Sequence, residues 1–74
     1  MRLKIRLDTD SDAVKLVGIA SGIKENITLT DGNGLCVSAK SLLGTMYVRF
    51  EFNEIWLETE NEHYFAFKDF VVEE

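Results

Sequence analysis

Aliphatic and basic residues alternate along the first seven positions of the chain, with aliphatic side chains at Leu3, Ile5 and Leu7. A period of two brings every second side chain of a strand to the same face, so that one face meets the core and the other meets water. Residues 1–7 therefore predict a half-buried strand whose basic side chains are solvated.

The alternation stops at residues 8–12, where acidic and hydroxyl side chains of the helix N-cap type gather. Beyond them, apolar residues recur with helical spacing at Val14, Val17 and Ala20. Gly22 stands where a helix often ends in a left-handed residue. We predict a helix over about residues 11–22, with acidic residues at its start that complement the helix dipole.

Two further apolar runs flank a turn. Ile27 and Leu29 alternate with polar residues, which predicts a second strand. Residues 31–34 read Asp-Gly-Asn-Gly, and glycine and asparagine tolerate the positive φ that tight turns require. Residues 35–37 are apolar again and predict a third strand, which pairs with the second strand as a hairpin.

A short apolar segment follows the hairpin at residues 42–46. Ser41, directly before it, has the hydroxyl side chain of a helix N-cap, so we expect a helix of two turns to begin there. On such a short helix Leu42 and Thr45 would fill the single inward face. Leu43 and Met46 would then be at least partly exposed.

The last third of the chain predicts a strand and a helix. Residues 54–58 alternate acidic and apolar side chains, as a strand does. In residues 62–74 the helical spacing of Tyr64, Phe67 and Val71 predicts a helix, although the β propensity of this segment also suits a strand. The order βαββαβα predicts a single α+β domain over residues 1–74, with helices on one face of a mainly antiparallel sheet.

Charge and cysteine content narrow the functional classes. The 74-residue chain has a formal net charge of −5, and its basic residues are dispersed, so we expect neither nucleic acid nor a membrane as a partner. The chain has no apolar run that resembles a signal peptide or approaches the ~20 residues of a membrane span. With one cysteine it forms no internal disulfide, which favours a cytoplasmic protein. We expect no cofactor and no metal, and the oligomeric state stays open.

Three residues are of types that often take part in catalysis or binding, but the sequence also suggests a structural role for each of them. We expect His63 to be a solvated surface histidine and Cys36, amid apolar neighbours, to be a buried and inert thiol. Trp56 lies out of phase with the apolar residues beside it. It would either line an interface on the open face of the sheet or be covered by Phe50, Phe52 or the tail.

Asp8, Asp10 and Asp12 have the spacing that begins a calcium-binding loop. The glycine and the closing glutamate of such a loop are replaced by Ala13 and Ile19, so the sequence favours helix capping for these aspartates.

Three segments, together with the order of the elements, carry a family resemblance. Residues 16–21 are similar to the end of a first helix, and residues 31–34 to a hairpin turn. Residues 37–46, Val-Ser-Ala-Lys-Ser-Leu-Leu-Gly-Thr-Met, contain a Lys-Ser pair before two aliphatics, a glycine and a methionine. The chain thereby resembles the HPr family, the phosphocarriers of the phosphotransferase system. The resemblance implies an open-faced β-sandwich.

The resemblance also shows that the chain lacks the histidine on which the family carries phosphate. HPr accepts phosphate from enzyme I on a histidine at the N-terminus of its first helix, in a His-x-Arg-Pro pattern. In this chain the corresponding loop consists of Thr9, Asp10, Ser11 and Asp12. Its aspartates would repel an incoming phosphoryl group. We therefore expect a degenerate phosphocarrier loop with no catalytic residue.

The regulatory serine of the family does have a counterpart, Ser41. A phosphate on Ser41 would be stabilised electrostatically by the helix dipole and by the nearby Lys40. Leu42, Leu43 and Met46 correspond to the aliphatic patch on which partners of the family dock. In lacking the histidine and keeping the serine, the chain is similar to the catabolite-repression HPr proteins.

These features predict a regulatory or adaptor module that binds other proteins and is phosphorylated on Ser41, with a serine kinase or phosphatase or a transcription regulator as the implied partner. One alternative is an atypical phosphocarrier in sugar uptake, which would relay phosphate through a residue of the 9–12 loop or through His63. Another is a degenerate paralogue that has neither site.

Overall fold

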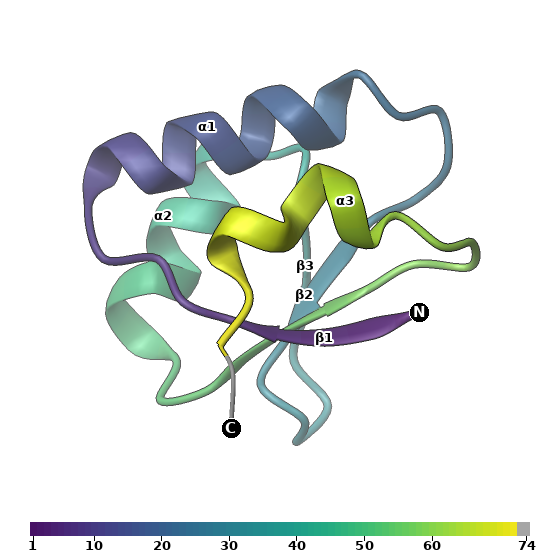
Figure 1. Cartoon of the computed structure of the whole chain (residues 1–74). Coiled ribbons are helices and arrows are strands. Elements are labelled where there is room, and N and C mark those ends of the chain that lie inside the picture. The colour runs from purple at the N-terminus through teal and green to yellow at the C-terminus, as the bar shows by residue number, and fades with distance from the viewer. Residues whose placement is uncertain (73–74) are drawn as a thin grey trace.

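The computed structural model describes residues 1–72, and within them four antiparallel strands form one sheet in the order β1-β4-β2-β3 (Figure 1). The strands are β1 (Arg2–Ile5), β2 (Thr28–Thr30), β3 (Cys36–Ser38) and β4 (Ile55–Glu58). Strands β2 and β3 form the predicted hairpin, with Gly32 and Gly34 at positive φ in its turn. The inner strand β4 pairs with both β1 and β2.

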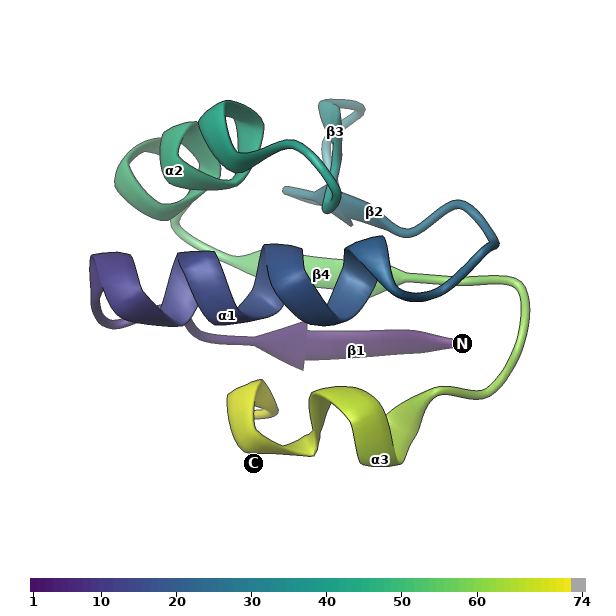
Figure 2. The ribbon, with the colours of Figure 1, turned by 90° about the horizontal axis from the view of Figure 1, so that it is seen from above.

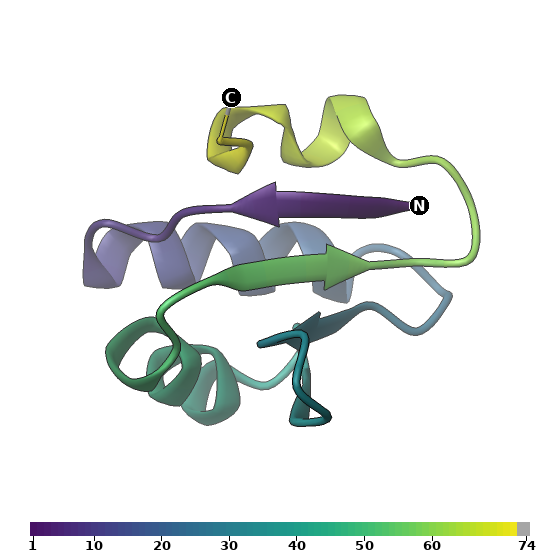
Figure 3. The same cartoon turned by 90° about the horizontal axis from the view of Figure 1, so that it is seen from below.

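The helices lie on one face of this sheet. They are α1 (Asp10–Ser21), α2 (Leu42–Glu51) and the short α3 (Tyr64–Phe67), which continues as the 3-10 turn η1 (Lys68–Phe70). Helix α1 runs alongside β1 and β4, with α2 and α3 on either side of it (Figure 2). Seen from the opposite side, β1 and β4 stand in front of α1 (Figure 3). The protein is therefore an α+β domain with an antiparallel sheet, as predicted.

Strand alternation divides the sheet into an inner and an open face. Leu3, Leu57, Leu29 and Val37 follow one another across the four strands and face the helices. The next row, on the open face, consists of Lys4, Trp56, Thr30 and Cys36. The inner face completes its core with buried residues of the helices and of the tail, among them Leu16, Val48, Phe67 and Phe70.

Helix α1 begins and ends close to the predicted limits, but its buried face differs. Ala13, Leu16 and Ala20 are buried, whereas Val14, the first residue of the apolar spacing that predicted this helix, is 55% exposed. The buried stripe through Ala13, Leu16 and Ala20 overlaps the predicted spacing at Ala20 but contains Ala13 in place of Val14. The expected left-handed helix end is also wrong, since Gly22 has φ −82°.

Helix α2 is longer than the sequence predicted. Ser41 caps it, as expected, but the helix continues to Glu51 because Val48, one turn beyond Thr45, is also buried. Leu42 was expected to face inward, and this is wrong: it is 46% exposed. Thr45 does face inward, as predicted, and Val48 takes the place expected for Leu42.

The tail is helical only in part. Tyr64 and Phe67 lie in α3 as predicted, but Val71 leaves the helix and forms an antiparallel bridge with Ile5. Backbone hydrogen bonds of 2.9 Å from Arg6 to Phe70 and from Val72 to Lys4 continue this pairing along β1. Residues 73–74 of the predicted last element lie outside the described part of the chain.

Candidate functional site

Ser41 stands at the exposed N-terminus of α2. Its hydroxyl oxygen accepts a hydrogen bond of 3.1 Å from the backbone amide of Gly44, which is the geometry of an N-cap. Lys40 precedes it, and its own amide donates 3.2 Å to the hydroxyl of Ser38. The Ser41 side chain is thus accessible to an enzyme, next to a lysine, at the positive end of a ten-residue helix.

Helix α2 carries an exposed apolar stripe, defined here as Leu43, Tyr47 and Phe50. The exposed fractions of these three residues are 86%, 53% and 68%. Their spacing of i, i+4 and i+7 places them on one side of the helix. Leu42 widens the stripe at its first turn. Met46 is half-buried and therefore partly exposed, as expected. The sequence interpretation missed Tyr47 and Phe50 because it ended the helix before them.

The other side of α2 is fixed against β3 and the core. Thr45 and Val48 are fully buried, and Gly44 lies so close to β3 that a Cβ atom there would collide with the side chain of Val37. The α2 stripe is therefore presented by a helix whose rotation about its own axis is determined by packing.

The loop of residues 9–12, the predicted degenerate phosphocarrier loop, is a closed capping box. The Thr9 hydroxyl accepts 3.1 Å from the Asp12 amide, and the Asp12 carboxylate accepts 3.0 and 3.2 Å from the amides of Asp8 and Thr9. Capping, as predicted for these residues, therefore occupies amides that could otherwise bind an anion.

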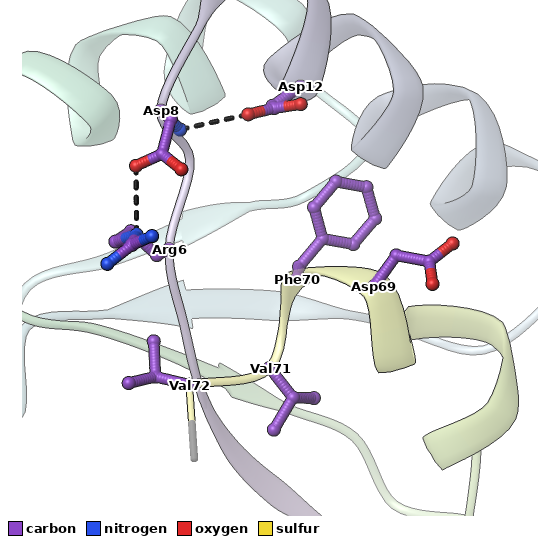
Figure 4. A pocket seen from close by; sticks show the side chains of 7 residues that line it. All are labelled: Arg6, Asp8, Asp12, Asp69, Phe70, Val71 and Val72. Carbon is purple, nitrogen blue, oxygen red and sulfur yellow. Dashed lines mark hydrogen bonds and ion pairs between the residues drawn. The ribbon is translucent and has the colours of Figure 1, made fainter. Parts of the chain in front are cut away.

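A hollow of about 370 Å³ lies beside this loop, between it and residues 69–72 (Figure 4). Asp8, Asp12 and Asp69 border it, and Arg6 is paired with Asp8 at 2.9 Å between Nε and Oδ1. Three carboxylates and one guanidinium give the hollow an excess of negative charge, which is unfavourable for a phosphoryl group.

Helix α2 and the loop of residues 9–12 meet at Arg49, which lies in the last turn of α2. Its Nη2 donates a hydrogen bond of 2.8 Å to the backbone carbonyl of Asp8, so α2 contacts the chain just before α1. Ser41 lies at the opposite end of α2. The structure thus brings the loop next to the C-terminal end of the helix, and Ser41 stands at the far end.

His63 differs from the expectation of a solvated side chain. It is half-buried, and its Nε2 pairs with Oε1 of Glu25 in the loop after α1. The other oxygen of Glu25 accepts the amides of Glu60 and Asn61 at 3.1 and 3.2 Å. Burial alone would raise the pKa of Glu25, but the hydrogen bonds from His63 and from the two amides, with the charge of His63, lower it overall.

Cys36 and Trp56 both lie on the open face of the sheet. The expectation of a buried thiol is wrong, because Cys36 is exposed at the edge strand β3 and faces away from the helices. Trp56 is half-buried; the Arg2 guanidinium lies 4.3 Å from the centroid of its ring, and its Nε1 donates 3.4 Å to Glu54. Arg2 is thus a cover of Trp56 that sequence reasoning did not consider.

Residues 1–72 contain neither a candidate metal site nor a candidate membrane span. No three His, Cys, Asp or Glu side chains of this part of the chain are grouped so that they could hold a metal ion. None of its helices has the length and apolar character needed to cross a bilayer.

Comparison of the chain with protein-family models, with curated proteins and with solved structures gives no match.

Proposed function

We propose that this protein is an HPr-like regulatory or adaptor module of the cytoplasm, which binds other proteins through Ser41 and the α2 stripe and carries no phosphate on histidine. Two features support an HPr-like open-faced β-sandwich: the order of the elements, and the placement of all described helices on one face of the sheet. The Lys-Ser-Leu-Leu-Gly segment around Ser41 supports the same assignment.

The observation that carries the proposal is the exposure of the α2 stripe. Leu43, Tyr47 and Phe50 leave large apolar side chains in water on one side of a single helix. A contiguous apolar surface of this kind on a small domain is typical of a protein interface. The buried Thr45 and Val48 on the opposite side mean that the helix cannot turn the stripe inward without losing its packing.

The 9–12 loop supports a role other than phosphate transfer. The amides of Asp8, Thr9 and Asp12 are occupied by the capping box, and the adjacent hollow carries excess negative charge. Incubation with phosphoenolpyruvate and enzyme I should therefore leave the intact mass unchanged. An acid-labile gain of one phosphate, lost on His63→Ala, would establish the alternative of an atypical phosphocarrier.

Phosphorylation of Ser41 is tested with an HPr serine kinase and ATP, again by intact mass. The expected result is a gain of one phosphate that Ser41→Asn abolishes. Asparagine is the suitable replacement because it caps a helix about as well as serine, so the variant should keep its fold. Ser38→Ala, which alters a neighbouring exposed serine, should leave the gain unchanged. Phosphate on a residue other than Ser41, or none, would contradict the regulatory site.

A further inference from the structure

The α2 stripe leads into a hollow of about 470 Å³ between the end of α2 and the hairpin turn. Apolar walls and carboxylates both line this acidic hollow, which is defined here by Asp31, Leu35, Tyr47, Glu51, Phe52 and Glu54. Tyr47 belongs to both surfaces. Leu43, Tyr47 and Glu51 follow one another at i, i+4 and i+8, so the apolar stripe passes directly into the acidic hollow along one line of α2.

The carboxylates of the acidic hollow are only partly compensated. Asp31 accepts the backbone amides of Asn33 and Leu35 at 2.7 and 3.3 Å, which holds its carboxylate in the turn. Glu54 lies 3.6 Å from the ammonium of Lys4. Glu51 forms no hydrogen bond or ion pair with any residue in the described part of the chain, and it is exposed.

We propose that the protein segment that docks on the α2 stripe is basic and amphipathic, and that it places an arginine or lysine in the acidic hollow. This inference rests on the proposed function and specifies its partner. The partner's cation would meet Glu51 and the Tyr47 ring, while its aliphatic stem packs along Leu35 and Phe52. An apolar residue one or two turns away on the partner would cover Leu43 and Phe50.

Charge complementarity is the reason for choosing this occupant. A neutral segment could cover the stripe but would leave Glu51 without a counter-charge, and an acidic segment would in addition be repelled by the net charge of −5. A basic segment is attracted over a distance of about 10 Å at moderate ionic strength. Its binding should therefore weaken as salt increases, whereas purely apolar docking should not.

The test begins with a displayed library of random peptides selected on the intact chain. Binders are then synthesised and their affinities measured by fluorescence anisotropy. Most binders that are lost on Leu43→Asp should contain arginine or lysine close to apolar residues. Glu51→Lys should weaken these peptides about tenfold, because it removes one attraction and adds a repulsion. Glu62→Lys makes the same charge change on an exposed residue outside the hollow and should change the affinity less than about twofold.

The outcomes separate this inference from the proposed function. Peptides that require Leu43 but show no preference for basic residues, or that bind Glu51→Lys as well as the native chain, would overturn the basic partner and leave the stripe as an interface. A selection that yields no peptide sensitive to Leu43→Asp would overturn both. Circular dichroism of each variant verifies that the fold is retained, which is expected since Leu43 and Glu51 are exposed.

Discussion

Arg49 Nη1 lies 2.8 Å from Asp10 Oδ1, so the last turn of α2 is held to the first turn of α1. The same guanidinium reaches the Asp8 carbonyl and lies 4.8 Å from the centroid of the Phe50 ring. Arg49 therefore contacts both the start of α1 and one residue of the α2 stripe. Its planar fork suits this arrangement in a way that a lysine ammonium would not.

Replacing Arg49 should loosen the contact between α1 and α2. Arg49→Met keeps the aliphatic stem but removes both hydrogen bonds, and we expect it to lower the free energy of unfolding by about 1 kcal/mol. Asp10→Asn should cost less, because Asp10 is exposed and water screens its charge. Urea unfolding of both variants and of the double mutant measures the coupling. A coupling of zero would mean that the ion pair does not stabilise the contact between α1 and α2.

The α2 stripe should be dispensable for stability. Leu43→Asp exchanges an exposed side chain in the first turn of the helix, where an acidic residue also gains from the dipole, so the free energy of unfolding should change by less than about 0.5 kcal/mol. Val48→Ala, on the buried side of the same helix, should cost about 1–3 kcal/mol. Thermal unfolding of the two variants compares the faces directly. If Leu43→Asp were the more damaging change, the stripe would belong to the core.

Gly44 should not tolerate a side chain. Gly44→Ala would drive a methyl group into Val37, whose branched side chain has little freedom to move, and should cost about 1–3 kcal/mol. Gly18→Ala is the matched control in α1. Within residues 1–72 no atom outside its own helix lies within 4 Å of the new methyl group, so alanine there should stabilise the protein by about 0.5–1 kcal/mol through helix propensity. Equal effects of the two substitutions would contradict the close approach of α2 to β3.

The ion pair of Glu25 and His63 should give a pH dependence with a defined sign. The pKa of Glu25 lies below its ordinary value of 4.5, so its contribution to stability is present above about pH 4.5 and is lost as the pH falls through the lowered pKa. Glu25→Gln should therefore be less stable than the native chain at pH 6 and should approach it towards pH 3. Urea unfolding across this range measures the difference, with Glu62→Gln as the control. A difference that grows on acidification would refute the sign.

Local patterns predicted most of the elements but not the way in which they turn towards one another. The alternation at Leu3 and Ile5 and the turn of residues 31–34 each depend on neighbours in sequence, so they identified a strand and a hairpin correctly. In α1 two apolar stripes overlap, one through Val14 and one through Ala13. Only the packing against the sheet selects between them.

In the candidate site, too, the features that depend on sequence neighbours were predicted and those that depend on tertiary packing were not. The N-cap role of Ser41 is local, and it was predicted. The segment from Tyr47 to Phe50 has high β propensity, and its helical state depends on the burial of Val48, so two of the three residues of the α2 stripe were missed. The spacing of Tyr47 and Phe50 at i+4 and i+7 from Leu43 was the pattern in the sequence that could have indicated a longer helix with these residues on one side. The partner of His63 lies 38 residues away in the chain, at Glu25, and no local pattern indicates it.

The pairing of β1 with β4 determines when this sheet can form. Arg2 lies opposite Glu58 and Ile5 opposite Ile55, so some fifty residues separate strands that are neighbours in the sheet. The hairpin of β2 and β3 closes a loop of only a few residues and can form early. Strand β1 leaves the ribosome first but has no partner until β4 follows. We therefore expect folding to be limited by this late closure, with β1 as the last strand to join the sheet.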